Sequence, residues 1–152
     1  MLEKNKKITY SGEEIIEVLK EIELLRVSLE VLENIMSINT EREQRGICNK
    51  YGAEFFPVED NLKLGISNNV KDGIAPINGM RLYPEDGTSG WFIWAGEEFS
   101  EDPYFFVPLH LEHIDEWVPN VKKYLGLAPG WRFLIDGEYE DVWFDKVILE
   151  DF

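Results

Sequence analysis

Cysteine is nearly absent from this chain of 152 residues, and the single one, Cys48, has no partner for an internal disulfide. Small secreted scaffolds depend on several disulfides, so that class is excluded. Long apolar runs are missing as well: the N-terminal residues are polar, unlike a signal peptide, and no run approaches the ~20 residues that cross a bilayer. We therefore expect a cytoplasmic protein.

Positive charge is the second scarcity. Thirty acidic residues face 15 lysines and arginines, which gives a net charge of -15, and no Lys or Arg lies between Leu82 and Val121. Nucleic acids and anionic membranes bind cationic patches, so we expect neither as a partner. An acidic surface attracts basic proteins instead, and a basic protein is the partner that the charge favours.

Two capping-box spacings, in which side chains satisfy the free amides of a helix start, predict two N-terminal helices. Ser11 with Glu14 predicts the first from about Gly12, and Thr40 with Glu43 predicts the second, which Gly52 would end. Apolar residues of the first helix alternate steps of three and four and form one stripe: Ile15, Val18, Ile22, Leu25, Leu29, Leu32 and Met36. The stripe predicts packing on the protein's own domain, and a homodimer or a docking helix through Ile15 to Met36 is the alternative.

Runs typical of strands follow, broken by Gly, Asn and Pro, at residues 62–70, 80–84, 90–96, 131–135 and 142–144. Residues 109–127 have the apolar spacing of a helix, with Pro119 as a kink. The sum is an α+β fold, in which two N-terminal helices precede a small, mostly antiparallel sheet with one further helix. We expect a single domain over residues 1–152, with 1–52 a helical extension packed on it.

Tryptophans and carboxylates gather between Gly90 and Trp143. Trp91 and Trp94 are three apart, so they point to opposite faces of a strand, and one of them is a candidate for the surface. Rings supply rigid buried area and carboxylates supply steering, which together suit the recognition of a basic protein. The predicted partner-binding residues are Trp94, Glu97, Glu98, Glu101, Asp102, Glu112 and Glu116.

His110 and His113 are the candidates for metal chemistry, because residues three apart share one face of a helix and imidazole suits zinc or iron. The spacing is wrong for the zincin motif, and a further ligand would have to be a carboxylate such as Glu97 or Glu98. A metal-dependent enzyme that uses this pair is the alternative function. The plainer interpretation is two histidines satisfied by their neighbours, and we expect no metal and no cofactor.

Other catalytic patterns are weaker still. Paired carboxylates such as Asp136 with Glu138 suit acid and base catalysis only in unlike environments, and Cys48 has no flanking motif of a nucleophile. The glycines form neither a phosphate loop nor a dinucleotide fingerprint. We therefore expect solvated carboxylates, a structural thiol and no catalytic residue.

The span Leu64 to Glu98 resembles the immunity protein 33 domain, a family of small bacterial proteins. The most specific part of the likeness is Ser89, Gly90 and Trp91, followed by Gly96, Glu97 and Glu98. Weaker agreement runs through Ser67, Asn68, Gly73, Met80, Arg81 and Pro84. Members are assigned as immunity proteins that neutralise a toxin, so the resemblance implies a cytoplasmic inhibitor that binds a cognate toxin without catalysis. The N-terminal helices and the C-terminal tail depart from the family core.

Overall fold

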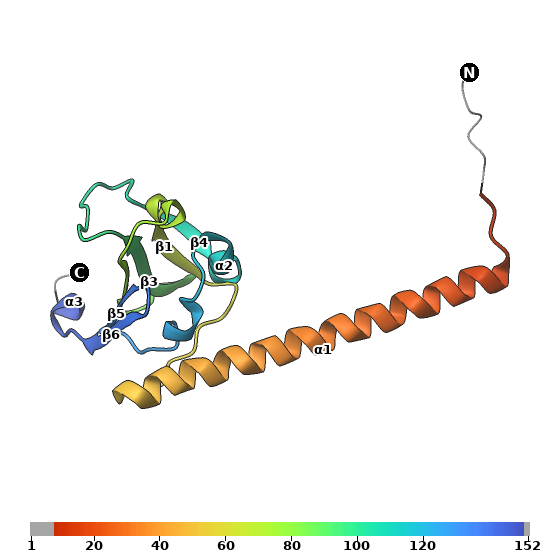
Figure 1. Ribbon diagram of the computed structural model, residues 1–152, viewed down its shortest axis with the longest axis horizontal. Coiled ribbons are helices and arrows are strands. Elements are labelled where there is room, and N and C mark those ends of the chain that lie inside the picture. Colours follow the sequence, from red (N-terminus) through yellow and green to blue (C-terminus); the bar gives the residue numbers. More distant parts are fainter. Residues whose placement is uncertain (1–7, 151–152) are drawn as a thin grey trace, which may run out of the picture. The chain divides into compact units, whose positions relative to one another are not determined.

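The computed structural model describes residues 8–150 and divides the chain into two units, Met1–Asn39 and Thr40–Phe152 (Figure 1). Helix α1, Gly12–Tyr51, runs through the boundary and therefore contributes to both. We expected the helical extension to end at residue 52, which is where α1 ends. The two units divide earlier, between Asn39 and Thr40. The packing of the extension on the domain stays a prediction.

Helix α1 begins and ends as the sequence predicts. The amide of Ser11 donates to Glu14 Oε2 at 3.1 Å, and the amide of Glu14 donates to Ser11 Oγ at 3.2 Å, which completes the capping box. At the other end Gly52 has a φ of 73°, and the amide of Ala53 donates to the Cys48 carbonyl at 2.8 Å. This is the hydrogen bond of a Schellman cap, which suits glycine because the left-handed region costs it nothing.

The prediction of two N-terminal helices is wrong, because α1 is one continuous helix. Residues 37–40 are Ser, Ile, Asn and Thr, which lower helix propensity by only about half a kilocalorie per mole each. Neither Pro nor Gly occurs between Gly12 and Gly46, so nothing breaks the ladder of backbone hydrogen bonds. A capping-box spacing therefore starts a helix only where the chain before it is not already helical.

The second unit is built on a mixed sheet of six strands, in the order β4-β1-β3-β2-β5-β6. The strands are β1 Lys63–Ser67, β2 Ile77–Arg81, β3 Thr88–Ala95, β4 Phe106–His110, β5 Trp131–Asp136 and β6 Tyr139–Phe144. Strand β1 runs parallel to β3, and the remaining neighbours pair antiparallel. The α+β class and the mostly antiparallel sheet are thus confirmed.

Short helices complete the second unit. They are the 3-10 turns η1 Asn68–Asp72, η2 Leu111–His113 and η3 Lys122–Tyr124, and the helices α2 Ile114–Trp117 and α3 Val147–Glu150. The long helix predicted over 109–127 is therefore wrong: β4 takes its start, and only four residues of it are α-helical. Its apolar spacing still marks buried positions: Leu111, Ile114, Val118, Val121 and Leu125 are all in the core.

Each face of the sheet carries its own apolar cluster. Trp91 and Ile93 of β3 join the main core, which includes Ile47 and Cys48 from the end of α1. Trp94 joins a smaller cluster on the other face, with Ile148 of α3 and Phe106 packed against it. The two tryptophans of β3 thus point to opposite faces, as their spacing predicts.

In the part of the chain that the structure describes, none of the helices combines the length and the apolar character that crossing a membrane requires.

Candidate partner-binding surface

The cluster Ser89, Gly90 and Trp91 holds β3 in place. Gly90 has a φ of 84°, and a Cβ there would lie 2.1 Å from the Leu82 carbonyl oxygen, so only glycine fits. Ser89 Oγ donates to the Lys63 carbonyl at 3.0 Å, and Trp91 Nε1 donates to the Leu125 carbonyl at 3.0 Å. These side chains therefore tie β3 to β1 and to the segment after η3.

Arg81, the last residue of β2, extends this framework into the core. Its side chain is 1% exposed and donates to backbone carbonyls alone. The acceptors are Ser89 at 3.0 Å, Phe56 at 2.7 Å, Leu127 at 2.7 Å and Leu125 at 3.4 Å. Desolvation lowers the pKa of Arg81 to about 10, so the guanidinium is still charged at neutral pH. Arg81 thus joins β3, the segment around Phe56 and the segment after η3 through their backbone carbonyls.

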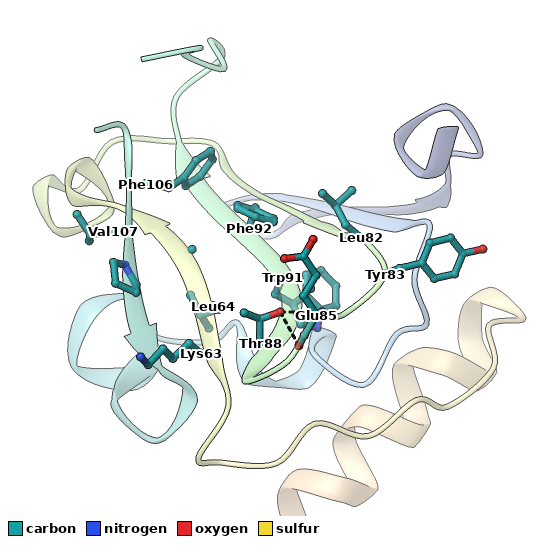
Figure 2. Close-up of a pocket in the computed structure, with 13 residues that line it drawn as sticks. Lys63, Leu64, Leu82, Tyr83, Glu85, Thr88, Trp91, Phe92, Phe106 and Val107 are labelled. Atoms are coloured by element: carbon teal, nitrogen blue, oxygen red, sulfur yellow. Dashed lines mark hydrogen bonds between the residues drawn. The ribbon is translucent and has the colours of Figure 1, made fainter. Parts of the chain in front are cut away.

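This framework forms one side of an apolar groove with a volume of about 330 Å³, drawn in Figure 2. Phe92 of β3 and Phe106 of β4 lie at one end of it, with ring centroids 5.2 Å apart, and Lys63 lies toward the other end. The full lining is Lys63, Leu64, Gly65, Leu82, Tyr83, Glu85, Thr88, Gly90, Trp91, Phe92, Phe106, Val107 and Pro108. Gly65 lets the Phe92 ring lie close to β1, because a Cβ there would stand 2.7 Å from that ring.

The groove adjoins an acidic loop through Phe106. This loop, residues 97–104, connects β3 to β4, and its Phe99 ring packs 5.5 Å from Phe106 and 5.3 Å from Trp94. Phe99 is 42% exposed and Tyr104 is 86% exposed. Asp102 shapes the loop, since its Oδ1 accepts the Tyr104 amide at 2.9 Å and its carbonyl accepts the Phe105 amide at 3.0 Å.

The carboxylates of the loop are exposed and unpaired. Glu97, Glu98, Glu101 and Asp102 all face solvent, and within residues 8–150 none of them forms an ion pair with Lys, Arg or His. Four negative charges thus lie on the same loop as two exposed rings, Phe99 and Tyr104. The four carboxylates repel one another, and a cationic surface that binds the loop reduces this repulsion.

The remaining predicted contact residues are placed differently. Trp94 is 3% exposed and lies beneath Phe99, so its ring is not part of the accessible surface. Glu112 follows β4, whereas the acidic loop precedes it, so the five residues of the strand separate them by about 13 Å. Glu112 and Glu116 flank His113, at 3.3 Å and 3.5 Å from its ring nitrogens. The structure thus brings the loop carboxylates together and leaves Glu112 and Glu116 as a second acidic group.

The histidine pair does not form the centre of a ligand set. His110 Nδ1 lies 3.1 Å from the Asn61 carbonyl, while His113 contacts the two glutamates described above. Over residues 8–150 no group of three or more His, Cys, Asp or Glu side chains is placed to hold a metal ion. The metal hypothesis therefore gains no geometric support from the described residues.

A polar cluster around Glu140 of β6 is a feature that the sequence analysis missed. Its carboxylate accepts hydrogen bonds from Lys50 Nζ at 2.8 Å, Tyr51 OH at 2.6 Å and Tyr124 OH at 2.5 Å. Burial raises the pKa of Glu140, but the hydrogen bonds from Lys50, Tyr124 and Tyr51 outweigh it and lower the pKa to about 2. The donors come from two segments far apart in the chain, the end of α1 and η3, which is why no local pattern indicates the cluster. Through these three hydrogen bonds Glu140 joins β6 to the end of α1 and to η3.

Comparison with curated proteins and with solved structures returns no match. The chain does match a protein family, the Imm33-like domain, over residues 43–145. The match contains the resemblance seen at Leu64 to Glu98 and extends it to most of the second unit, including the acidic loop and the strands β5 and β6. The expectation that the C-terminal tail departs from the family core is therefore wrong. The chain therefore belongs to the Imm33-like domain family.

Proposed function

We propose that this protein is an immunity-type binding protein that neutralises a cognate bacterial toxin, and that the toxin binds the acidic loop 97–104 and the groove beside it. Membership of the Imm33-like family supports the general class. The choice of surface rests on the geometry of the second unit. Neutralisation occurs by masking the toxin, without catalysis by this chain.

The unpaired carboxylates of the loop carry the proposal. Glu97, Glu98, Glu101 and Asp102 lie within six residues of one another and are exposed, with no cationic side chain of the described residues beside them. A charged patch of this kind raises the association rate with a basic partner and makes that rate depend on salt. A small inhibitor that must reach its toxin quickly benefits from both effects.

The groove supplies the apolar part of the interface. Its volume of about 330 Å³ is enough for one large side chain of a partner, and its walls are mainly aromatic and aliphatic. Binding energy in protein interfaces concentrates where such a side chain enters a pocket surrounded by polar groups. We therefore propose that the toxin inserts an apolar residue beside Phe106 while its basic residues meet the loop.

Charge reversal tests the acidic loop. The variant replaces Glu97, Glu98, Glu101 and Asp102 with lysine, and the matched control makes the same replacement at four other exposed carboxylates, Glu54, Glu59, Asp136 and Glu138. The binding partner is the candidate toxin encoded beside this protein, and association is followed at low and moderate salt. The loop variant is expected to associate at least tenfold more slowly and to lose most of the salt dependence, while the control keeps both. Equal behaviour of the two variants would place the interface elsewhere.

Two tyrosines of similar exposure test the groove. Tyr83 lines it and is 66% exposed, whereas Tyr139 lies in β6 and is 61% exposed. Truncation of Tyr83 to alanine is expected to accelerate dissociation about tenfold, and Tyr139→Ala is expected to leave it unchanged. If Tyr83→Ala dissociates like the wild type, the groove does not hold the anchor residue.

A further inference from the structure

The apolar stripe of α1 from Ile15 to Leu32 takes no part in the proposed function. From Ile15 to Leu32 the exposed fraction of its members runs from 48% at Val18 to 65% at Leu25. Monomeric proteins rarely expose a continuous apolar surface of this length, because each such side chain gains free energy on leaving water. Something therefore covers the stripe in solution.

The spacing of the stripe is that of a coiled coil. In heptad notation Ile15, Ile22 and Leu29 take position a, with Met36 after them, and Val18, Leu25 and Leu32 take position d. The pattern continues for about three heptads without interruption, which is the length at which it becomes a specific signal. Isoleucine at a, as in Ile15 and Ile22, and leucine at d, as in Leu25 and Leu32, favour two parallel strands over larger assemblies. Leu29 and Val18 depart from this pattern, so the orientation needs a second argument.

The charges beside the stripe favour a second copy in parallel orientation. Glu21 takes position g and Arg26 takes position e, so a parallel pair places Glu21 of each helix opposite Arg26 of the other. Arg26 already pairs with Glu23 of its own helix, which holds the guanidinium near this edge. In an antiparallel pair, g positions face g positions of the other helix. The two antiparallel alignments that keep most of the stripe in contact place Ser28 or Ile35 opposite Glu21, and neither carries a positive charge.

We propose that the first unit forms a parallel, two-stranded coiled coil with the first unit of a second copy. Each dimer then carries two Imm33-like domains, so a partner that presents two binding sites would be held more tightly than by one domain. This inference stands apart from the proposed function, because it concerns another part of the chain and its test requires no toxin.

Solution mass tests the inference directly. The full-length protein at about 50 μM is expected to have twice its chain mass of 17.7 kDa by light scattering or sedimentation equilibrium. A mass of 17.7 kDa would overturn the proposal and would instead support packing of the stripe within one chain. A mass above two chains would overturn the two-stranded form.

Paired variants separate the stripe from the rest of the helix. Leu25→Glu with Leu32→Glu puts two charges into the seam and is expected to give monomers, whereas Lys20→Glu with Asn34→Glu adds two glutamates on the outer face and is expected to leave dimers. Equal masses for the two variants would overturn the assignment of the seam. Circular dichroism of each variant shows whether the sheet domain stays folded.

Orientation is read from a cysteine in the seam. In a Cys48→Ala background, Leu25→Cys places two thiols in one layer of a parallel pair, and mild oxidation is expected to link most of the chains as covalent dimers. In an antiparallel pair residue 25 faces residue 22 or 29 instead, so failure to link while the mass stays dimeric would overturn the parallel arrangement. This experiment keeps the seam intact, so its result does not depend on whether the glutamate variants stay folded.

Discussion

The stability of the sheet domain should depend on the ionised form of Glu140. In the folded protein this carboxylate accepts hydrogen bonds from Lys50, Tyr51 and Tyr124, and its pKa falls from 4.5 to about 2. Each unit of such a shift is worth about 1.4 kcal/mol, so the full shift sets an upper value near 3 kcal/mol. Lys50 is 61% exposed and solvent screens its charge, which reduces the expected contribution to about 2 kcal/mol.

The sign of the pH dependence follows from the direction of the shift. Because the pKa is lower in the folded state, Glu140 contributes its full stability above the unfolded value, near pH 4.5. That contribution is lost progressively as the pH falls from about 4.5 through the folded pKa near 2, and only below that pH is the carboxylate protonated in both states. A Glu140→Gln variant lacks the ionised form at every pH, so its difference from the wild type should follow the same curve.

The assay is urea unfolding of both proteins at pH 7, 5, 4 and 3, with the free energy of unfolding taken from the midpoint and slope. We expect Glu140→Gln to be about 2 kcal/mol less stable at pH 7 and 5, with a smaller difference at pH 4 and 3. Glu138→Gln, at an exposed neighbour, is the control and should change stability by less than about 0.5 kcal/mol. A difference for Glu140→Gln that is constant from pH 7 to 3 would refute the electrostatic origin.

Two further predictions concern the framework behind the groove. Arg81→Leu leaves the carbonyls of Phe56, Ser89 and Leu127 without their donor, so urea unfolding should show a loss of about 3–5 kcal/mol in the free energy of unfolding. The control Arg42→Leu, at an exposed position, should change stability by less than about 0.5 kcal/mol. A loss below about 1 kcal/mol for Arg81→Leu would contradict its structural role. Gly90→Ala combines a positive φ with a clash against a carbonyl oxygen 2.1 Å away, while Gly87→Ala has a similar φ of 78° and open space around it. Gly90→Ala should therefore lower the thermal midpoint by several degrees more than Gly87→Ala, and equal shifts would mean that the clash is relieved by backbone movement.

The predictions from the sequence succeeded where the signal was local. The capping box of Ser11 with Glu14 and the stop at Gly52 describe the ends of α1, and runs of β-type residues describe β1, β3 and β5. The runs at 80–84 and 142–144 overlap only the ends of β2 and β6. Strand β4 was missed because it is a short edge strand with Pro108 inside it, and proline is tolerated there since an edge strand has unpaired amides.

The segment after β4 shows how a burial pattern can be right while the element is wrong. Ile114, Val118 and Val121 have the spacing of one helix face and are 0%, 4% and 0% exposed. Pro119 and the positive φ of 68° at Asn120 stop the helix, and a 3-10 turn continues the chain with a similar period. Periodicity near three or four thus reports which side faces the core and does not fix the hydrogen bonding.

The groove and the Glu140 cluster could not be predicted from the sequence, for a different reason. The lining of the groove comes from β1, β3, β4 and the turn around Tyr83, and the donors to Glu140 come from α1 and η3. Only the pairing of the strands brings these residues together, and strand order is a long-range property that no short window of sequence contains. The acidic loop was found early because its carboxylates are adjacent in the chain.

The residues that carry the resemblance to the family have structural roles beside the groove, and this affects how binding experiments are interpreted. Gly90 and Trp91 line the groove, yet their positions are set by Ser89, Arg81 and the carbonyl of Leu125. A substitution at any of them changes the fold and the groove together, so lost binding in such a variant does not identify a contact. The loop carboxylates have no ion pairs to lose within the described residues, and Tyr83 is exposed. Changes at these positions separate recognition from folding, which is why the charge reversal and Tyr83→Ala carry the test of function.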